Sequence, residues 1–173
     1  PAGDTSRIPF AVYTDPALHQ RELERLFYNG HWCYVGLEAE VPNPGDFKRT
    51  VVGERSVILS RAADGTLHCL ENVCAHRGMQ FCRQRHGSGM KEFVCPYHQW
   101  SYTLSGDLQG VPLRRGVRQD GQVKGGMPAD FNPKDHSLTK LKVASRGGVV
   151  FASFDHGVEP LDDYLGPTIL AYY

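Results

Sequence analysis

Apolar and polar positions along most of the chain alternate in short runs, and turn residues separate these runs. Five runs stand out, at residues 32–37, 46–52, 56–61, 66–71 and 149–154. Alternation over this length is typical of half-buried β-strands. Candidate hairpin turns lie at Gly53-Glu54, at Ala63-Asp64-Gly65 and at Ser105-Gly106-Asp107. The pattern predicts a mainly antiparallel β fold.

The N-terminal part has helical signals instead. Asp15 is a suitable N-cap, Pro16 suits the first helical position and Gly30 can end the helix. We therefore predict one helix over residues 16–29. Residues 112–134 are rich in glycine and charge with little periodicity, which predicts a long surface excursion.

The predicted organisation has three parts. Residues 1–45 hold the helix and a strand, residues 46–158 form the β domain, and residues 159–173 begin a connection to a further domain. The last part ends in an apolar run from Ile169 to Tyr173, which an isolated domain would leave exposed.

The composition narrows the possible partners and compartments. With 173 residues, 40% of them hydrophobic, the chain can form one substantial core. The formal net charge is zero, so we expect neither nucleic acid nor a membrane as a partner. No apolar stretch approaches the roughly 18 residues of a membrane span, and residues 1–7 lack a signal-peptide pattern, which predicts a soluble, cytoplasmic protein.

Two short clusters carry the candidate chemistry: Cys74-Ala75-His76 and Cys95-Pro96-Tyr97-His98. Each follows a strand-like run, so two loops can bring two thiolates and two imidazoles together. Two sulfur ligands on one iron and two nitrogen ligands on the other are the ligand set of a Rieske [2Fe–2S] cluster. The alternative is a structural Cys₂His₂ zinc site, although the one-residue gap between Cys74 and His76 departs from the usual zinc spacing.

The other three cysteines do not extend this set. Cys33 and Cys69 lie in apolar runs and are predicted to be small buried hydrophobes. Cys82 lies in a basic segment, and two interpretations are open for it. It is either a packing residue, which we favour, or a reactive thiol with a lowered pKa.

The residues around the two clusters carry a family resemblance. Cys74-Ala75-His76-Arg77-Gly78 and Cys95-Pro96-Tyr97-His98-Gln99-Trp100 resemble the cluster loops of the Rieske domain at the N-terminus of the large (α) subunit of aromatic-ring-hydroxylating oxygenases. The resemblance covers the whole chain and is strongest to the salicylate 5-hydroxylase group, with anthranilate and terephthalate dioxygenases more distant. It implies a Rieske-type antiparallel β-sandwich with a smaller cluster-binding subdomain and one N-terminal helix.

The resemblance also implies roles and partners. Cys74 and Cys95 would bind the buried iron, and His76 and His98 the outer iron. A ferredoxin, fed by an NAD(P)H-dependent ferredoxin reductase, would supply electrons for a mononuclear Fe(II) in a neighbouring α subunit of an α₃ or α₃β₃ assembly, the latter with a small β subunit. That iron would hydroxylate an aromatic acid, salicylate to gentisate. The alternatives are a stand-alone Rieske ferredoxin or the α subunit of an anthranilate or terephthalate dioxygenase.

The mononuclear iron needs two histidines and a carboxylate. Neither Asp135-His136 nor Asp155-His156 has a second histidine at suitable spacing, so we expect this site to lie in a catalytic domain outside the chain.

Three further expectations concern the surroundings of the cluster. Gln99 stands where many family members have glycine, so we expect a backbone conformation there that does not require glycine. Respiratory Rieske proteins have a serine donor where this chain has Trp100, which predicts a reduction potential toward the low end of the range, although Tyr102 retains a phenolic donor.

Finally, the segment between the two ligand pairs is either a positive rim for an acidic ferredoxin or a merely solvated loop. Its charges are Arg77, Arg83, Arg85 and Lys91, opposed by Glu92.

Overall fold

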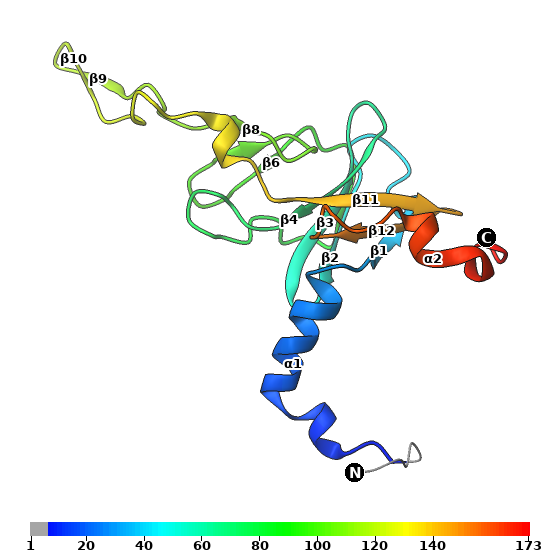
Figure 1. Ribbon diagram of the computed structural model, residues 1–173. Coiled ribbons are helices and arrows are strands. Elements are labelled where there is room, and N and C mark those ends of the chain that lie inside the picture. The colour runs from blue at the N-terminus through cyan, green and yellow to red at the C-terminus, as the bar shows by residue number, and fades with distance from the viewer. Residues whose placement is uncertain (1–6) are drawn as a thin grey trace.

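The computed structural model describes residues 7–173, and most of its regular structure is antiparallel β (Figure 1). The strands are β1 (Cys33–Leu37), β2 (Phe47–Val52), β3 (Arg55–Arg61), β4 (Leu67–Glu71), β5 (His86–Gly87), β6 (Phe93–Val94), β7 (Ser101–Tyr102), β8 (Leu108–Gly110), β9 (Val117–Gln119), β10 (Gln122–Lys124), β11 (Lys140–Arg146) and β12 (Val149–Ser153). The helices are α1 (Pro16–Glu22) and α2 (Leu161–Leu170), with single turns η1 (Phe10–Tyr13), η2 (Leu23–Phe27), η3 (Glu38–Glu40) and η4 (Pro133–His136).

Seven strands form the main sheet, in the order β1-β12-β11-β4-β3-β2-β5. Side chains from opposite ends of this order share one aliphatic core, since Val35 of β1 and Val52 of β2 both pack with Leu59 of β3. The sheet therefore curls around its own core. All five predicted strands are present, and the predicted turns at residues 53–54 and 63–65 each close a hairpin.

The predicted mainly β fold class is thus confirmed. The prediction missed β11, which pairs with both β4 and β12 and so joins the two halves of the sheet. β1, which we had assigned to the N-terminal part, pairs with β12. The domain boundaries at residues 45 and 158 stay a prediction.

The predicted helix begins as expected. The Asp15 carboxylate accepts hydrogen bonds from the amides of Ala17 and Leu18, which caps the first turn of α1. From Leu23 onward the backbone changes to a π-helical turn, in which the Tyr28 amide bonds to the Leu23 carbonyl, so the end at residue 29 was set two residues too late.

A smaller sheet, β6-β7-β8, lies beside the main one and carries the predicted turn at residues 105–107. The Ser60 hydroxyl donates a 2.7 Å bond to the Leu104 carbonyl and so ties this sheet to β3. Beyond β8 the chain runs outward in the expected surface excursion, which projects far from the body in Figure 1. The excursion ends in the hairpin β9-β10, which we had not predicted.

The C-terminal segment is more ordered than expected. It forms α2, whose Leu161 is buried against Trp32 and Val158. The helix is kinked at Gly166, where φ is 69°. The apolar residues after the kink remain exposed as predicted, since 89% of Tyr172 and 48% of Ile169 are accessible to solvent. Within the described part of the chain, none of the helices has the length and apolar character needed to cross a bilayer.

Candidate metal centre

The two predicted ligand loops close in the same way. In each, the cysteine amide donates to the carbonyl five residues later, and the amide four residues later donates back to the cysteine carbonyl. The bonds are Cys74 to Met79 (2.8 Å) and Gly78 to Cys74 (2.9 Å) in the first loop, and Cys95 to Trp100 (2.8 Å) and Gln99 to Cys95 (2.9 Å) in the second. Each loop therefore holds its own shape.

This closure defines the backbone conformation of Gln99, which the sequence had left open. Gly78 and Gln99 occupy equivalent places, with φ of 72° and 58°, in the left-handed region that favours glycine. The conformation does not require glycine, as expected, but it is one that glycine adopts at a lower steric cost than Gln99.

The two predicted sulfur ligands lie at the buried end of the site. Cys74 and Cys95 are each only 2% exposed. Burial raises the pKa of Cys95, and the neighbouring Cys74 thiol raises it further, as two thiolates side by side repel each other.

Tyr102 provides a polar partner for this pair. Its hydroxyl oxygen lies 3.2 Å from Cys74 Sγ and accepts a 3.1 Å bond from the Ala75 amide. Burial is the main cause of a raised Tyr102 pKa, so the phenol keeps its proton. Because its oxygen already accepts the amide, the hydroxyl hydrogen is free to be donated to Sγ.

The two predicted nitrogen ligands lie at the outer end. The rings of His76 and His98 are 4.6 Å apart between centroids and nearly perpendicular. Trp100 stacks on His76 at 4.7 Å, and Tyr97 stacks on His98 at 3.9 Å. Desolvation lowers the pKa of His76, with smaller contributions from His98 and Arg77, which favours the neutral imidazole that metals bind.

The four side chains thus form a sulfur pair and a nitrogen pair. In residues 7–173 no three His, Cys, Asp or Glu side chains converge on a single ion position. A mononuclear zinc site requires four ligands around one point, whereas a two-iron cluster requires two ligands at each end. The donor set and its division into pairs fit a Rieske cluster.

Comparison with known proteins agrees with this geometry. The sequence model of the Rieske [2Fe-2S] domain matches residues 31–123, more than half of the chain. The chain belongs to the Rieske domain family.

The similarity extends beyond the matched residues. Over its full length the chain is 69% identical to the large oxygenase component of salicylate 5-hydroxylase from a Ralstonia species, and covers 41% of that protein. Over 96% of its length it is 51% identical to the anthranilate 1,2-dioxygenase large subunit of Burkholderia cepacia, of which it covers 38%. The Rieske chain therefore spans about two fifths of the curated relatives it matches.

Solved structures give the same result for the fold. A naphthalene 1,2-dioxygenase from a Rhodococcus species has a TM-score of 0.81 with 33% identity, over 95% of this chain and 35% of that one. The Rieske-type β fold expected from the resemblance is confirmed.

The remaining cysteines of the Rieske domain are structural. Cys69 is buried in β4, and burial raises its pKa. Cys33 is half-buried in β1, and desolvation raises its pKa too. Burial also raises the pKa of Cys82, so a reactive low-pKa thiol there is wrong and the favoured packing role holds.

The two Asp-His pairs do not form a site either. The Asp155 carboxylate accepts bonds from the backbone amides of Gly30 and Gly157, and the His156 ring bonds to the Lys140 carbonyl. His136 stacks on Phe131 at 4.7 Å.

Asn72 is a buried residue near the ligand loops whose positioning role the sequence did not reveal. It is fully buried, and its amide accepts a bond from the Cys82 nitrogen (2.9 Å) and donates one to the Cys82 carbonyl (2.8 Å). This two-point contact fixes the segment between the ligand loops. An asparagine inside the strand-like run before Cys74 was the available signal, because a buried amide must find partners.

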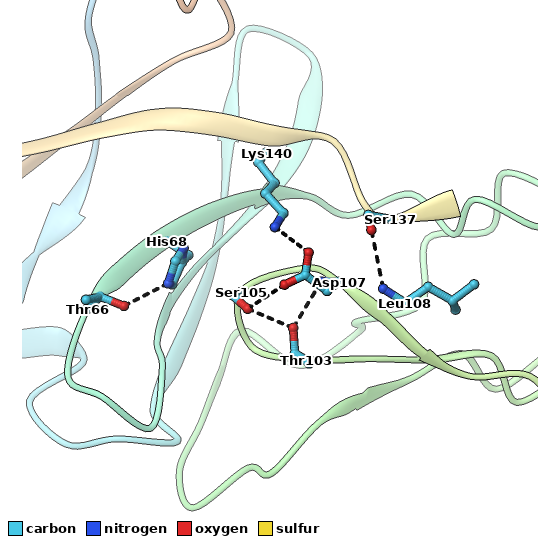
Figure 2. A network of polar contacts seen from close by, with 8 residues as sticks. All are labelled: Thr66, His68, Thr103, Ser105, Asp107, Leu108, Ser137 and Lys140. Atoms are coloured by element: carbon cyan, nitrogen blue, oxygen red, sulfur yellow. Dashed lines mark hydrogen bonds and ion pairs between the residues drawn. The ribbon is translucent and has the colours of Figure 1, made fainter. Parts of the chain in front are cut away.

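A polar network surrounds the turn between β7 and β8 of the small sheet (Figure 2). Lys140 of β11 pairs with Asp107 at 2.6 Å, and Ser105 donates to the same carboxylate. Nearby, Thr66, just before β4, and His68 of β4 bond at 2.8 Å. The turn between β7 and β8 is thereby attached to the main sheet, so the ligand loop that precedes β7 has a fixed base.

Proposed function

We propose that this Rieske domain is the electron-transfer part of an aromatic-ring-hydroxylating oxygenase. Cys74 and Cys95 would hold the inner iron of a [2Fe–2S] cluster, and His76 and His98 the outer iron. Such a cluster accepts and releases one electron at a time. Electrons would come from a reduced ferredoxin, itself served by an NAD(P)H-dependent reductase, and go to a mononuclear non-haem iron elsewhere in the enzyme.

The single observation that carries the proposal is the orientation of the two pairs. The thiols are buried in a core of aromatic and aliphatic side chains, whereas His76 is exposed. Because electrons cross short distances best, the imidazole end is the natural port for both donor and acceptor.

Reconstitution of the cluster tests the ligand set. Anaerobic addition of iron and sulfide should give two irons and two sulfides per chain, and reduction should give the low average g-value of mixed sulfur and nitrogen ligation. Cys74→Ser and His98→Ala should abolish that signal. Cys82→Ser and His86→Ala are matched controls at positions outside the proposed ligand set, and both should retain it. A colourless protein, or one zinc per chain, would contradict the proposal.

The donor would dock on the positive rim formed by Arg77, Arg83, Arg85 and Lys91. All four residues are exposed, and Glu92, the opposing charge, is engaged by Gln109. Arg77 lies over the Tyr97 ring at 5.5 Å, which brings positive charge next to the proposed ligand His98. An acidic ferredoxin would be steered to such a rim.

Stopped-flow reduction by ferredoxin tests the docking. Arg83→Gln with Arg85→Gln should slow the bimolecular rate at low salt and flatten its salt dependence. Arg25→Gln, in η2 of the N-terminal part, is the control. An unchanged rate at low ionic strength would refute the steering.

The similarity to salicylate 5-hydroxylase supports salicylate as substrate and gentisate as product, in an α₃ or α₃β₃ assembly in which the acceptor iron lies in a neighbouring subunit. The test is the full-length subunit with its electron donors. Oxygen uptake and product analysis should show preference for salicylate over anthranilate and terephthalate, and a reversed preference would contradict the assignment.

A further inference from the structure

We propose that Phe131 and His136 are positioning residues that hold Trp100 against His76 and thereby set the reduction potential of the proposed cluster. The inference rests on the proposed function, and it concerns two residues that lie more than thirty positions beyond the second ligand loop.

A continuous series of ring contacts leads from the surface excursion to the ligand. His136 and Phe131 stack at 4.7 Å with only 8° between their planes. Both rings then meet Trp100 edge to face at 5.9 Å. Trp100 in turn stacks on His76 at 4.7 Å and 12°. Planar groups packed in this way restrict one another's rotation.

The outer end of this series is itself anchored. The Arg114 guanidinium lies 5.4 Å from the centre of the Phe131 ring and bonds to the Phe131 carbonyl. The Asn132 side chain caps η4 by accepting from the Lys134 amide, and the buried Leu138 bonds to the Gly106 carbonyl just beyond η4. The chain segments just before and just after His136 are therefore both held in place.

The same rings border an open cleft of about 390 Å³, whose lining includes His76, Trp100, Met127, Phe131 and His136. Trp100 covers one face of the otherwise exposed His76 ring, so the rings that hold Trp100 decide how closely water can approach that face. The apolar shell around a metal centre controls solvent access and local dielectric, and through them the potential. Since reduction adds one negative charge to a Rieske cluster, more water beside His76 favours the reduced state.

The test uses the reconstituted protein. Phe131→Ala and His136→Ala should raise the midpoint potential and change the ligand-nitrogen hyperfine coupling seen by pulsed EPR, at unchanged cluster content. His136→Phe keeps a planar ring and should restore both values. Lys134→Ala, in the same short helix, is the control and should change neither. Should Phe131→Ala destabilise the excursion, the milder Phe131→Leu gives a smaller shift in the same direction.

The outcomes separate the two proposals. A wild-type protein that forms no Rieske cluster would overturn both. A normal cluster whose potential and nitrogen coupling are the same in Phe131→Ala, His136→Ala and the wild type would overturn the positioning role alone, as would a His136→Phe variant that behaves like His136→Ala.

Discussion

The core of the main sheet and the core of the smaller cluster-binding part contain different kinds of side chain. β3 of the main sheet has seven residues and packs Val57 and Leu59 into an aliphatic core. β6 and β7 of the cluster-binding part have two residues each, and their core adds aromatic rings and cysteine sulfur to leucine and isoleucine side chains, the aromatic rings including Phe81, Phe93 and Trp100. Because such short hairpins are barely stable alone, the cluster-binding part depends on specific contacts, and in our proposal on iron, whereas the sheet depends on burial.

Removal of iron should produce the largest difference in amide protection between the two regions. Binding energy at a metal site is also folding energy for the loops that form it. In the apo protein we expect amide protection to drop in both ligand loops, at residues 74–79 and 95–100, and to persist in β3 and β4. Hydrogen exchange with mass spectrometry measures both. An equal loss of protection in β3 would mean that the sheet also depends on the cluster.

The reverse experiment removes aliphatic volume from the sheet. Leu59 is fully buried, so Leu59→Ala should cost about 2–5 kcal/mol of the free energy of unfolding through lost burial and the cavity left behind. Urea denaturation gives the value, and the EPR signal of the folded protein should stay unchanged. Val51→Ala is a control at an exposed position of β2. A cost near that of the control would show that the core can collapse around the gap.

Removal of one oxygen atom from the cluster-binding part should change the reduction potential of the proposed cluster. Tyr102→Phe removes the hydroxyl beside Cys74 Sγ but keeps the buried ring. Hydrogen bonds to cluster sulfur favour the reduced form, so the variant should have a lower midpoint potential. A bond of about 1.4 kcal/mol corresponds to about 60 mV for one electron. Redox titration should show this fall, and Tyr97→Phe, beside His98, should show little change.

The loop closure gives a smaller, stabilising prediction. Gln99→Gly should raise the free energy of unfolding by about 1 kcal/mol, because glycine has no Cβ to strain at a φ of 58°. Thermal unfolding measures the gain. Gln84→Gly, in a segment without positive φ, should be neutral or destabilising, and a gain there as large as at residue 99 would remove the conformational explanation.

The smallest expected effect is a pH dependence from His68. Burial lowers its pKa in the folded protein, with a further contribution from Lys140, and the carboxylates of Asp64 and Asp107 offset this in part. The unfolded state therefore binds a proton first, and stability should fall as pH drops through about 6.5 toward the folded pKa. His68→Gln should flatten this part of the stability curve. The acid loss from Asp107, whose pKa Lys140 lowers, begins at a lower pH and should remain.

The sequence revealed those features that local chemistry determines. The proposed ligand residues, the hairpin turns and the Asp15 cap all have neighbours in sequence that explain them. β11 had a usable signal too, since Lys140 and Lys142 alternate with Leu141 and Val143. The bond between Asn72 and Cys82 and the stack of Phe131 on His136 beside Trp100 bring together residues that only the folded chain makes neighbours. The left-handed conformation of Gln99 could not be predicted from the sequence, because the hydrogen bond that requires it is visible only once the loop is closed.

Each ligand loop is a self-contained backbone unit, although one places its histidine two positions after the cysteine and the other three. A protein engineer could therefore exchange the donor atoms in one unit, for example by His98→Cys, and keep the other unit as an internal reference. The same β framework would then carry two centres for comparison, the original with two sulfur and two nitrogen ligands and a variant with three sulfur ligands and one nitrogen ligand.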